Sequence, residues 1–352
     1  MNLRELSEIL ELSQTTVSRA LNGYPEVSEA TRRRVVEMAR RVNYIPNPRA
    51  RGLATGRTMT IGHVIPITTK HEMVNPIFAD FIAGAGESYA EAGYEMQLSI
   101  ISDEREEEIY RAMAERRSVD GVIVHGPMID DDRISLLSEL GLPFVSHGRA
   151  GGTTDGYSWM DVNNRGAFRR ATDFLLDLGH RRIGLINGQE RMNFAARRRL
   201  GYEQALIQRD LDLDPELVTS DEMTEHYGYG AARRLLALEV PPTAILVSSI
   251  LPAIGARRAL SDLGLELGRD VSIAIHDDAL SYLQNGGDIP LFTSTRSSVR
   301  AAGRECANML LRLIGDTETG PLQTLWEAEL VVGSSTGPAP NQKDQRHELL
   351  AK

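Results

Sequence analysis

Apolar residues at the start of the chain recur with the period of an α-helix. Leu6 and Leu10 lie on the apolar face of a first predicted helix, over about residues 3–11. Ser13 and Ser28 stand where their hydroxyls cap a second and a third helix by accepting from free backbone amides. Three short helices, with the second closely following the first, are typical of a helix–turn–helix unit. A helical cap on the N-terminus of an enzyme is the alternative that this pattern leaves open.

From about residue 60 the pattern changes to short apolar runs that alternate with longer helical stretches. The runs predict strands at 61–67, 95–101, 121–125, 143–147, 182–186, 244–247, 272–276 and 325–332. The stretches between them predict helices at 78–92, 105–117, 164–178, 198–209, 227–238, 253–263 and 299–314. Strands that alternate with helices imply parallel sheets covered on both faces. The length of 352 residues suffices for two or three folding units.

Charge is distributed unevenly between these two parts of the chain. The whole sequence carries a formal charge of −10. Residues 1–57 contain ten arginines, no lysine and six glutamates, so this part carries +4 and the remainder −14. A cationic head on an acidic body favours a nucleic-acid partner for the head, although basic helix faces are also common where they meet only solvent.

Composition argues against several other classes of protein. No stretch approaches the roughly 18 uncharged apolar residues of a membrane span. Charged residues at positions 4, 5, 8 and 11 argue against a secretory signal peptide. The single cysteine, Cys306, excludes an internal disulfide and a cysteine-rich zinc site. We therefore expect a cytoplasmic protein, associated with the nucleoid through its head, with no membrane partner.

A long, ordered signature runs through the predicted helix–turn–helix unit. It comprises SQTTVSRALN at 13–22, VS at 27–28 with TR at 31–32, and NYIPN at 43–47. This signature resembles the DNA-binding head of the lactose-repressor (LacI/GalR) family of transcription regulators. Glu11 departs from the family, which often has a glycine in the turn at that position.

The resemblance implies roles for individual residues of the head. The second helix would enter the major groove, where glutamine pairs with adenine and arginine with guanine. The residues that would read bases are Gln14, Thr15 and Arg19. Those that would contact the DNA backbone or neighbouring positions are Thr16, Ser18, Asn22 and Tyr44.

Residues 47–58 connect the head, residues 1–46, to the body. Prolines and glycines disfavour a stable isolated helix in this segment, so a flexible tether is one interpretation. In the family the same stretch folds into a hinge helix in the minor groove when DNA is bound. The resemblance then implies that Leu53 is an apolar wedge between base steps and that Arg49 meets phosphate.

Motifs along the body also resemble the effector domain of the family. They include NPIF at 75–78, VDGVI at 119–123, LGHRRI at 178–183, Arg198 with GY at 201–202, and VSI at 271–273 with DD at 277–278. The fold class that the resemblance implies is an all-α helix–turn–helix DNA-binding head plus an α/β effector domain. This domain, like periplasmic binding proteins, would have two doubly wound parallel-sheet subdomains that close on a ligand by a hinge motion.

The resemblance also implies boundaries within the effector-binding and dimerisation domain, residues 59–337. Its N-subdomain would span about 59–160 and 290–322, and its C-subdomain about 161–289 and 323–337. The remaining residues, 338–352, are expected to form a flexible tail.

In proteins with open parallel sheets, ligands bind beyond the carboxyl ends of the strands. A sugar needs polar partners for its hydroxyls and an apolar surface for its ring. By position, Arg198 and Asp277 match effector contacts of the family, although the two residues could instead form structural ion pairs. The other candidates are Phe78, His147, Trp159 and Ser248. Trp159 either stacks on a ligand ring or fills the core.

The resemblance to the family suggests the hypothesis that the effector is a small sugar such as an α-glucoside. Ser248 stands where the family frequently has asparagine, so the identity of the ligand does not transfer by analogy. Two-fold protein symmetry would match a homodimer to a pseudo-palindromic double-stranded operator. We therefore predict a sugar-controlled transcription regulator, a repressor. A solute-binding receptor of a sugar transport system is the main alternative, and the DNA-binding head opposes it.

No catalytic residue, metal site or cofactor is predicted, and a sugar-modifying enzyme is the weaker alternative. GSSTG at 333–337 matches the nucleophile motif G-x-S-x-G. That motif needs a helix directly after it, but a proline-rich stretch follows here.

Overall fold

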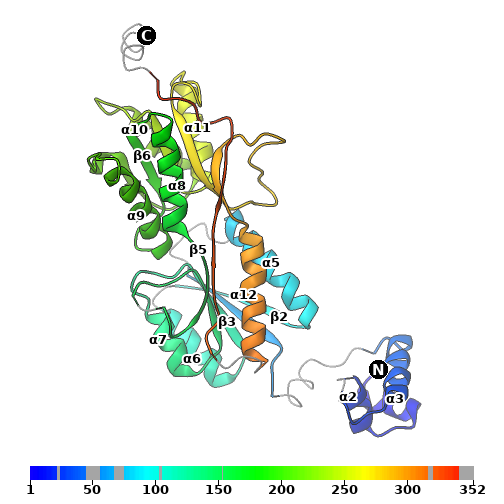
Figure 1. Ribbon diagram of the computed structural model, residues 1–352. Helices are drawn as coiled ribbons and strands as arrows, with labels where there is room; N and C mark the ends of the chain where they lie inside the picture. The colour runs from blue at the N-terminus through cyan, green and yellow to red at the C-terminus, as the bar shows by residue number, and fades with distance from the viewer. Residues whose placement is uncertain are drawn as a thin grey trace.

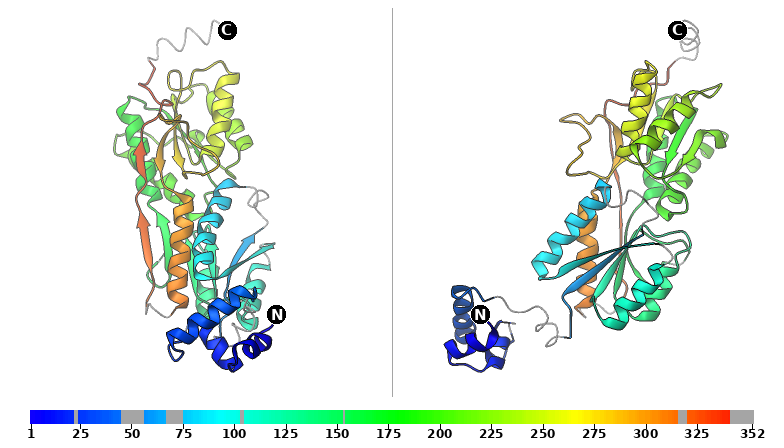
Figure 2. Two further views of the ribbon diagram at one scale, coloured as in Figure 1. Left: turned by 90° about the vertical axis from the view of Figure 1, so that its right-hand side faces the viewer. Right: turned by 180° about the vertical axis from the view of Figure 1, so that it is seen from behind.

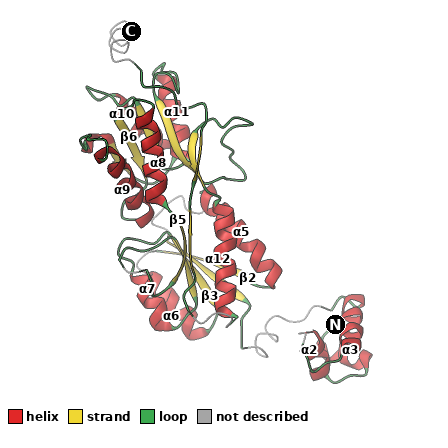
Figure 3. Ribbon diagram, viewed as in Figure 1, coloured by secondary structure: helices red, strands yellow, loops and turns green. Residues whose placement is uncertain are grey.

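The computed structural model describes residues 1–21, 24–44, 56–66, 75–102, 105–152, 154–315 and 320–340. These residues form a small head and a larger body whose two sheets lie one beyond the other (Figures 1 and 2). The head contains helices alone, whereas both halves of the body combine helices and strands (Figure 3). Within the described ranges, no helix is both long and apolar enough to cross a membrane.

Three helices build the head. They are α1 (Leu3–Leu10), α2 (Gln14–Leu21) and α3 (Glu29–Arg41). Their apolar faces meet in one small core, as the helical spacing predicts. The Ser13 hydroxyl accepts from the Thr16 amide at 3.0 Å, and the Ser28 hydroxyl accepts from the Thr31 amide at 3.3 Å. Both predicted caps are therefore confirmed.

The turn between α1 and α2 holds Glu11 in a left-handed backbone conformation. Glu11 has a φ of 52°, and its amide donates to the carbonyl oxygen of Glu8 at 3.2 Å. Glycine adopts this conformation freely, whereas a side chain there costs about 1–2 kcal/mol. A glutamate in this turn therefore carries a conformational cost that a glycine would not.

The first subdomain of the body is built on a six-stranded parallel sheet with the order β11-β5-β4-β3-β1-β2. Its strands are β1 (Thr60–Pro66), β2 (Glu95–Ile101), β3 (Gly121–His125), β4 (Phe144–His147), β5 (Ser158–Val162) and β11 (Gln323–Trp326). Its helices are α5 (Pro76–Ala92), α6 (Glu106–Arg116), α7 (Asp132–Leu140) and α12 (Val299–Ile314). Ile123 packs with α5 and α12, while Val122 and Val124 pack with α6 and α7, because successive side chains of a strand point to opposite faces.

Helices α5 and α12 cross at very short range. A Cβ atom on Gly84 would lie 1.9 Å from the carbonyl oxygen of Arg300, and one on Gly303 would lie 2.1 Å from that of Phe81. The crossing therefore requires glycine on both helices. It fixes the position of α5, whose first turns carry Phe78 and Phe81 toward the other subdomain.

The second subdomain repeats this arrangement with the strand order β12-β10-β9-β8-β6-β7. Its strands are β6 (Ile183–Asn187), β7 (Val218–Ser220), β8 (Ala244–Val247), β9 (Ser272–Asp277), β10 (Thr293–Arg296) and β12 (Glu329–Val331). Its helices are α8 (Asn164–Asp177), α9 (Asn193–Ile207), α10 (Glu225–Leu236), α11 (Ile250–Asp262) and the short 3₁₀ helix η3 (Pro215–Leu217). Among the described strands of this sheet, only β12 runs antiparallel to its neighbour, β10.

The chain passes between the subdomains after β5, after β10 and after β11. Two of the expected boundaries, near 290 and 322, are wrong by several residues. Thr293–Arg296 belongs to the second sheet, and Gln323–Trp326 pairs with β5 in the first. The apolar run at 325–332 predicted one strand, but two short strands in different sheets share it. Strand β10 was missed because its buried residues are threonine and serine.

The GSSTG segment has a structural place in the second subdomain. Ser335 is buried, donates from its hydroxyl to the carbonyl oxygen of Ile273 at 2.5 Å, and accepts from the Thr293 amide at 2.9 Å. Its hydroxyl thus joins the segment to the ends of two strands. Two backbone groups therefore hold this hydroxyl in a structural position.

Candidate functional site

Helix α2 presents a polar face away from the core of the head. Gln14, Thr15 and Arg19 are exposed, whereas Val17 and Ala20 are buried against the other two helices. In a helix–turn–helix unit the second helix lies in the major groove and its N-terminal side chains contact the bases. The three exposed side chains are those that the sequence assigned to base reading.

The remaining head candidates have more enclosed surroundings. Thr16 and Ser18 are half-buried, and the Thr16 hydroxyl lies 2.8 Å from that of Ser13. Tyr44 is half-buried against the head core, and this burial raises the pKa of its phenol. Three candidates lie outside the described residues: Asn22, Arg49 and Leu53.

A cavity of about 200 Å³ lies between the two subdomains of the body. It is lined by the carboxyl ends of strands from both sheets and by the first turns of several helices, which is where open parallel sheets bind ligands. Three of the six effector candidates line it: Phe78, His147 and Arg198. The other three do not: Trp159, Ser248 and Asp277.

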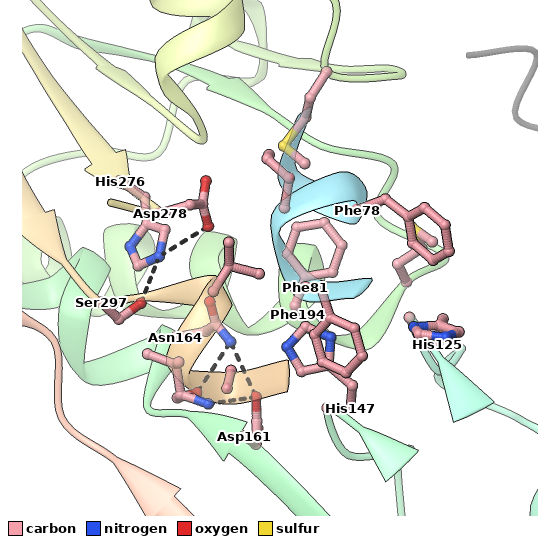
Figure 4. A pocket seen from close by; sticks show the side chains of 18 of the residues that line it. Phe78, Phe81, His125, His147, Asp161, Asn164, Phe194, His276, Asp278 and Ser297 are labelled. Carbon is pink, nitrogen blue, oxygen red and sulfur yellow. Dashed lines mark hydrogen bonds and ion pairs between the residues drawn. The ribbon is translucent and has the colours of Figure 1, made fainter. Parts of the chain in front are cut away.

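One side of the cavity, here called the aromatic wall, consists of Phe78, Phe81, His125 and His147 (Figure 4). Phe81 stacks on His147 with 4.4 Å between ring centroids, and Phe78 and Phe81 meet His125 edge-on at 5.1 and 5.0 Å. Burial lowers the pKa of His147 to about 4 and holds that of His125 well below its ordinary value. Both imidazoles are therefore neutral at pH 7, and the wall carries no charge.

The facing side, here called the polar wall, carries Asn164, His276 and Asp278 (Figure 4). Arg198, which also lines the cavity and is bonded to Asn164, is counted with this wall. The Nε of Arg198 donates to Asn164 Oδ1 at 2.8 Å, and its Nη1 donates to the carbonyl oxygen of Ser248 at 2.5 Å. Burial lowers the pKa of Arg198 to about 10, so this guanidinium stays charged at neutral pH. It is a buried cation that two hydrogen bonds hold in place beside the cavity.

Ring faces hold the same guanidinium from two further directions. Its central carbon lies 4.9 Å from the centroid of Phe194 and 5.1 Å from that of Phe168. Such contacts are favourable for a desolvated cation. Arg198 therefore owes its orientation to contacts with α8, with the loop after β8 and with Phe194 of its own helix.

The assignment of Asp277 to the cavity is wrong by one residue. Asp278 lines the cavity, while the Asp277 carboxylate accepts from the Ala279 amide at 2.9 Å and lies 3.8 Å from Arg296. Neighbouring residues of an extended strand point to opposite faces. Strand alternation from His276, which also lines the cavity, is the signal that would have identified Asp278.

Asp278 is an unusual acid. Burial raises its pKa to about 7, against the opposing effect of the Arg198 charge. Its Oδ1 lies 3.6 Å from Nε2 of His276, a ring whose pKa burial holds well below the ordinary value. This carboxyl therefore changes its charge near neutral pH within the polar wall.

Trp159 and Ser248 support the site from outside the cavity. Trp159 packs in the core of the first subdomain, and its ring lies 4.8 Å below the guanidinium of Arg149, which does line the cavity. The Ser248 hydroxyl donates to Asn187 Oδ1 at 2.7 Å, while its carbonyl oxygen holds Arg198. Both assignments as direct contacts are therefore corrected, because the side chains point into the core.

Hydrogen bonds bridge the two subdomains on either side of the cavity. The Asn193 amide group donates to the carbonyl oxygens of Arg149 and Ala150 at 2.6 and 3.1 Å. On the other side, the Asp80 carboxylate accepts from the amide and the hydroxyl of Ser281, each at 2.6 Å. Hydrogen bonds therefore join the two subdomains at two separate places.

Two family profiles match the chain. Residues 11–47 match "Bacterial regulatory proteins, lacI family", and residues 172–336 match "Periplasmic binding protein-like domain". The HTH-type transcriptional regulator AglR of Rhizobium meliloti (strain 1021) is 45% identical over 97% of this chain and 96% of its own length. The receptor alternative is not favoured, since this similarity spans head and body together.

Solved structures agree with these matches. A transcriptional regulator CelR–cellobiose complex has a TM-score of 0.71 at 29% identity, covering 95% of this chain and 99% of the solved one. The lac repressor dimer bound to operator and the anti-inducer ONPF has a TM-score of 0.78 over 96% of this chain and 99% of its own, and at 23% identity it shows the shared fold. The predicted fold class and family are confirmed: the chain belongs to the lacI family of bacterial regulatory proteins and is a helix–turn–helix transcription regulator.

Proposed function

We propose that this regulator is a repressor whose operator affinity is controlled by a sugar bound between the aromatic and polar walls. The observation that supports this most strongly is the opposition of the two walls across one cavity. A sugar ring has an apolar C–H face, which packs on aromatic rings, and hydroxyl groups around its edge, which need placed donors and acceptors. The similar regulator CelR is solved with cellobiose, which supports the same class of ligand.

The test is isothermal calorimetry of the full-length protein with maltose, sucrose, trehalose and cellobiose, with α-glucosides expected to bind best. Binding of the protein to a fluorescent DNA fragment from its own gene neighbourhood is then measured with and without the best sugar. Salt is held constant, because phosphate contacts make DNA affinity fall steeply as salt rises. Absence of heat with every sugar, or equal affinity for operator and random DNA, would overturn the proposal.

We further propose that Gln14, Thr15 and Arg19 read operator bases. Arg19→Ala is expected to lower operator affinity about 10- to 100-fold and to reduce the preference over random DNA. Arg116→Ala is the matched control, since it removes an equally exposed arginine from α6 of the body. Equal losses on operator and random DNA would remove Arg19 from base reading and leave it a phosphate contact.

Coupling between sugar and DNA is proposed to run through the loop after β9. Asp278 in the polar wall lies three residues before Ser281, which is bonded to Asp80 of the other subdomain. A ligand that engages Asp278 therefore also acts on a bond across the cleft. We propose that the resulting change in the angle between the subdomains decides whether the segment 47–58 folds in the minor groove, with Leu53 as its wedge. The DNA backbone or neighbouring positions would then be contacted by Arg49, Asn22, Thr16, Ser18 and Tyr44.

Asp80→Asn tests this coupling. It retains the size of the side chain and weakens the bonds to Ser281, so the sugar should shift operator affinity by a smaller factor than in the wild type. By reciprocity, the operator must then also shift sugar affinity by that smaller factor. An unchanged factor would exclude the Asp80–Ser281 contact from the coupling.

We also propose a homodimer that binds a pseudo-palindromic operator, in the cytoplasm and on the nucleoid. Strand β2 is an edge of the first sheet and exposes Leu98 and Ile100, by 42% and 49%. Exposed apolar edge strands favour association. Ile100→Arg should yield monomers in light scattering, whereas Ile207→Arg, at an exposed isoleucine of α9, should not. A dimeric Ile100→Arg protein would place the interface elsewhere.

A further inference from the structure

A row of hydrogen-bonded rings extends from the aromatic wall into the core of the first subdomain. His125 of β3 and His147 of β4 are paired neighbours in the sheet, and both line the cavity. His63 of β1 lies behind His125 and is fully buried, and Tyr89 of α5 lies behind His63. Among the described residues, these histidines do not form a group that could hold a metal ion.

The row has two hydrogen bonds. Nδ1 of His63 lies 2.9 Å from Nε2 of His125, and Nε2 of His63 lies 3.1 Å from the hydroxyl of Tyr89. The His63 and His125 rings stack with 5.2 Å between centroids. Among the described residues, the His125 ring is hydrogen-bonded through Nε2 alone, which leaves Nδ1, and the ring borders the cavity.

Both imidazoles in these bonds are neutral. Burial lowers the pKa of His63 to about 3 and that of His125 well below its ordinary value. A neutral imidazole has one nitrogen that donates and one that accepts. His63 therefore donates to one of its neighbours and accepts from the other, and only two orders of donation along the row exist.

The Tyr89 hydroxyl decides between these two orders. If Tyr89 donates to His63, then His63 donates to His125, and the proton of His125 is on Nδ1. In the reverse order Tyr89 accepts from His63, and its own proton has no acceptor among the described residues around this buried side chain. A buried donor without a partner is costly, so the first order is favoured.

We propose that Tyr89 and His63 are positioning residues that fix His125 as an N–H donor toward the effector. The inference rests on the proposed function of the cavity and names one requirement of its ligand. At the aromatic wall the ligand must offer a hydrogen-bond acceptor to Nδ1, such as a ring oxygen, a glycosidic oxygen or a hydroxyl lone pair. A ligand that presents only donors there, such as an ammonium group, is rejected.

The first experiment reads the tautomer directly, without a ligand. The full-length protein is labelled with 15N in histidine, and NMR distinguishes protonated from unprotonated ring nitrogens; a His125→Gln variant identifies the signals of His125. The expected result is a proton on Nδ1 of His125 in the wild type and a mixture of both tautomers in Tyr89→Phe. A proton on Nε2 in the wild type, or the same single tautomer in both proteins, overturns the proposal.

The second experiment measures sugar affinity by calorimetry, with maltose as the probe or another panel sugar if it binds the wild type better. Tyr89→Phe should weaken binding by about 2- to 10-fold, the range of one neutral hydrogen bond. Tyr110→Phe is the control, since it removes the hydroxyl of another fully buried tyrosine in the same subdomain. Equal affinities for wild type and Tyr89→Phe would contradict the proposed role in recognition.

The two experiments separate the two proposals. If the tautomers behave as expected but no sugar binds the wild type, the hydrogen-bonded row is established and the proposed sugar site fails. If a sugar binds but His125 carries its proton on Nε2, the site stands and the row does not orient its ligand.

Discussion

The two walls of the cavity are held in place by different interactions. The aromatic wall is held by ring packing, with Phe81 and His147 stacked at 4.4 Å, and its imidazoles are neutral. The polar wall is held by hydrogen bonds to the buried guanidinium of Arg198, which stays charged, while the Asp278 carboxyl beside it changes its charge near pH 7. A substitution in the polar wall leaves a buried charge or donor unpaired, whereas a substitution in the aromatic wall leaves a cavity.

This difference predicts an order of sensitivity. Loss of one partner from a buried charged network costs about 2–5 kcal/mol, because the other partner stays desolvated. Loss of one ring contact costs about 0.5–1.5 kcal/mol. Variants of the polar wall should therefore impair the effector response more than variants of the aromatic wall.

The largest effect is expected for Arg198→Met. The substitution keeps an unbranched side chain of similar length and removes the guanidinium that faces the ligand, so sugar affinity should fall at least about 100-fold. Operator affinity without sugar should persist, because the head is unchanged. The control is Arg199→Met at the next position, where the guanidinium pairs with Glu190 and Glu203 at the surface. Sugar binding within tenfold of the wild type would remove Arg198 from the site.

The next effect is a dependence of stability on pH that belongs to the polar wall. The ordinary carboxyl pKa of 3.8 applies to unfolded Asp278, and burial raises the folded value to about 7. Between these values the folded protein retains a proton that the unfolded chain has lost. The contribution of Asp278 to stability is therefore present below pH 4 and is lost as the pH rises to 7. The free energy of unfolding falls by up to about 1.4 kcal/mol per pH unit.

Histidines of the aromatic wall act in the opposite direction, so a variant is needed to separate the two. The lowered pKa of His147, about 4, makes its contribution to stability grow as the pH rises toward 6.5. Asp278→Asn removes only the titration of this carboxyl. The stability of the variant relative to the wild type, measured as the difference between their unfolding midpoints, should therefore rise between pH 5 and pH 7. The rise should correspond to about 2 kcal/mol in the free energy of unfolding. Parallel midpoint curves for the two proteins would show that Asp278 ionises normally.

A smaller effect is expected for the same substitution on binding. Asp278→Asn keeps the shape of the side chain and removes the charge, so sugar affinity at pH 8 should fall about tenfold. Asp277→Asn is the matched control, because that carboxyl caps the Ala279 amide outside the cavity and an asparagine oxygen can do the same. The assignment made from sequence predicts the reverse, with the loss at Asp277. Calorimetry of both variants decides between the two residues.

Much of the fold could be predicted from sequence because its signals are local. Ser13 and Ser28 act on amides three residues away, and apolar spacing places the helices of the head. Strands with continuous apolar runs, such as β3 and β8, were also found. Strand β10 was not, because Thr293, Ser294 and Thr295 are buried as polar residues, with Thr293 and Thr295 bonded to neighbouring segments.

The site was harder to predict, since it depends on contacts between distant parts of the chain. Arg198 was predicted by resemblance, and Phe78 and His147 were further candidates. Phe81 and His125 carried no motif, and the fold alone brings these two rings of α5 and β3 together. Asp277 and Asp278 are adjacent in sequence, and the register of one strand end decides which of them meets the cavity. A resemblance by position cannot resolve a difference of one residue at the end of a strand.

The smallest effect is expected at the aromatic wall, for Phe81→Leu. Leucine keeps the apolar character and most of the volume but loses the stacking surface beside His147, so sugar affinity should fall only about fivefold. Phe144→Leu is the control, since Phe144 stacks on Tyr157 in the core of the same subdomain and does not line the cavity. If Phe81→Leu instead abolished binding as Arg198→Met is expected to, ring packing would dominate recognition. The two walls would then differ in how they are held together and not in how much they contribute.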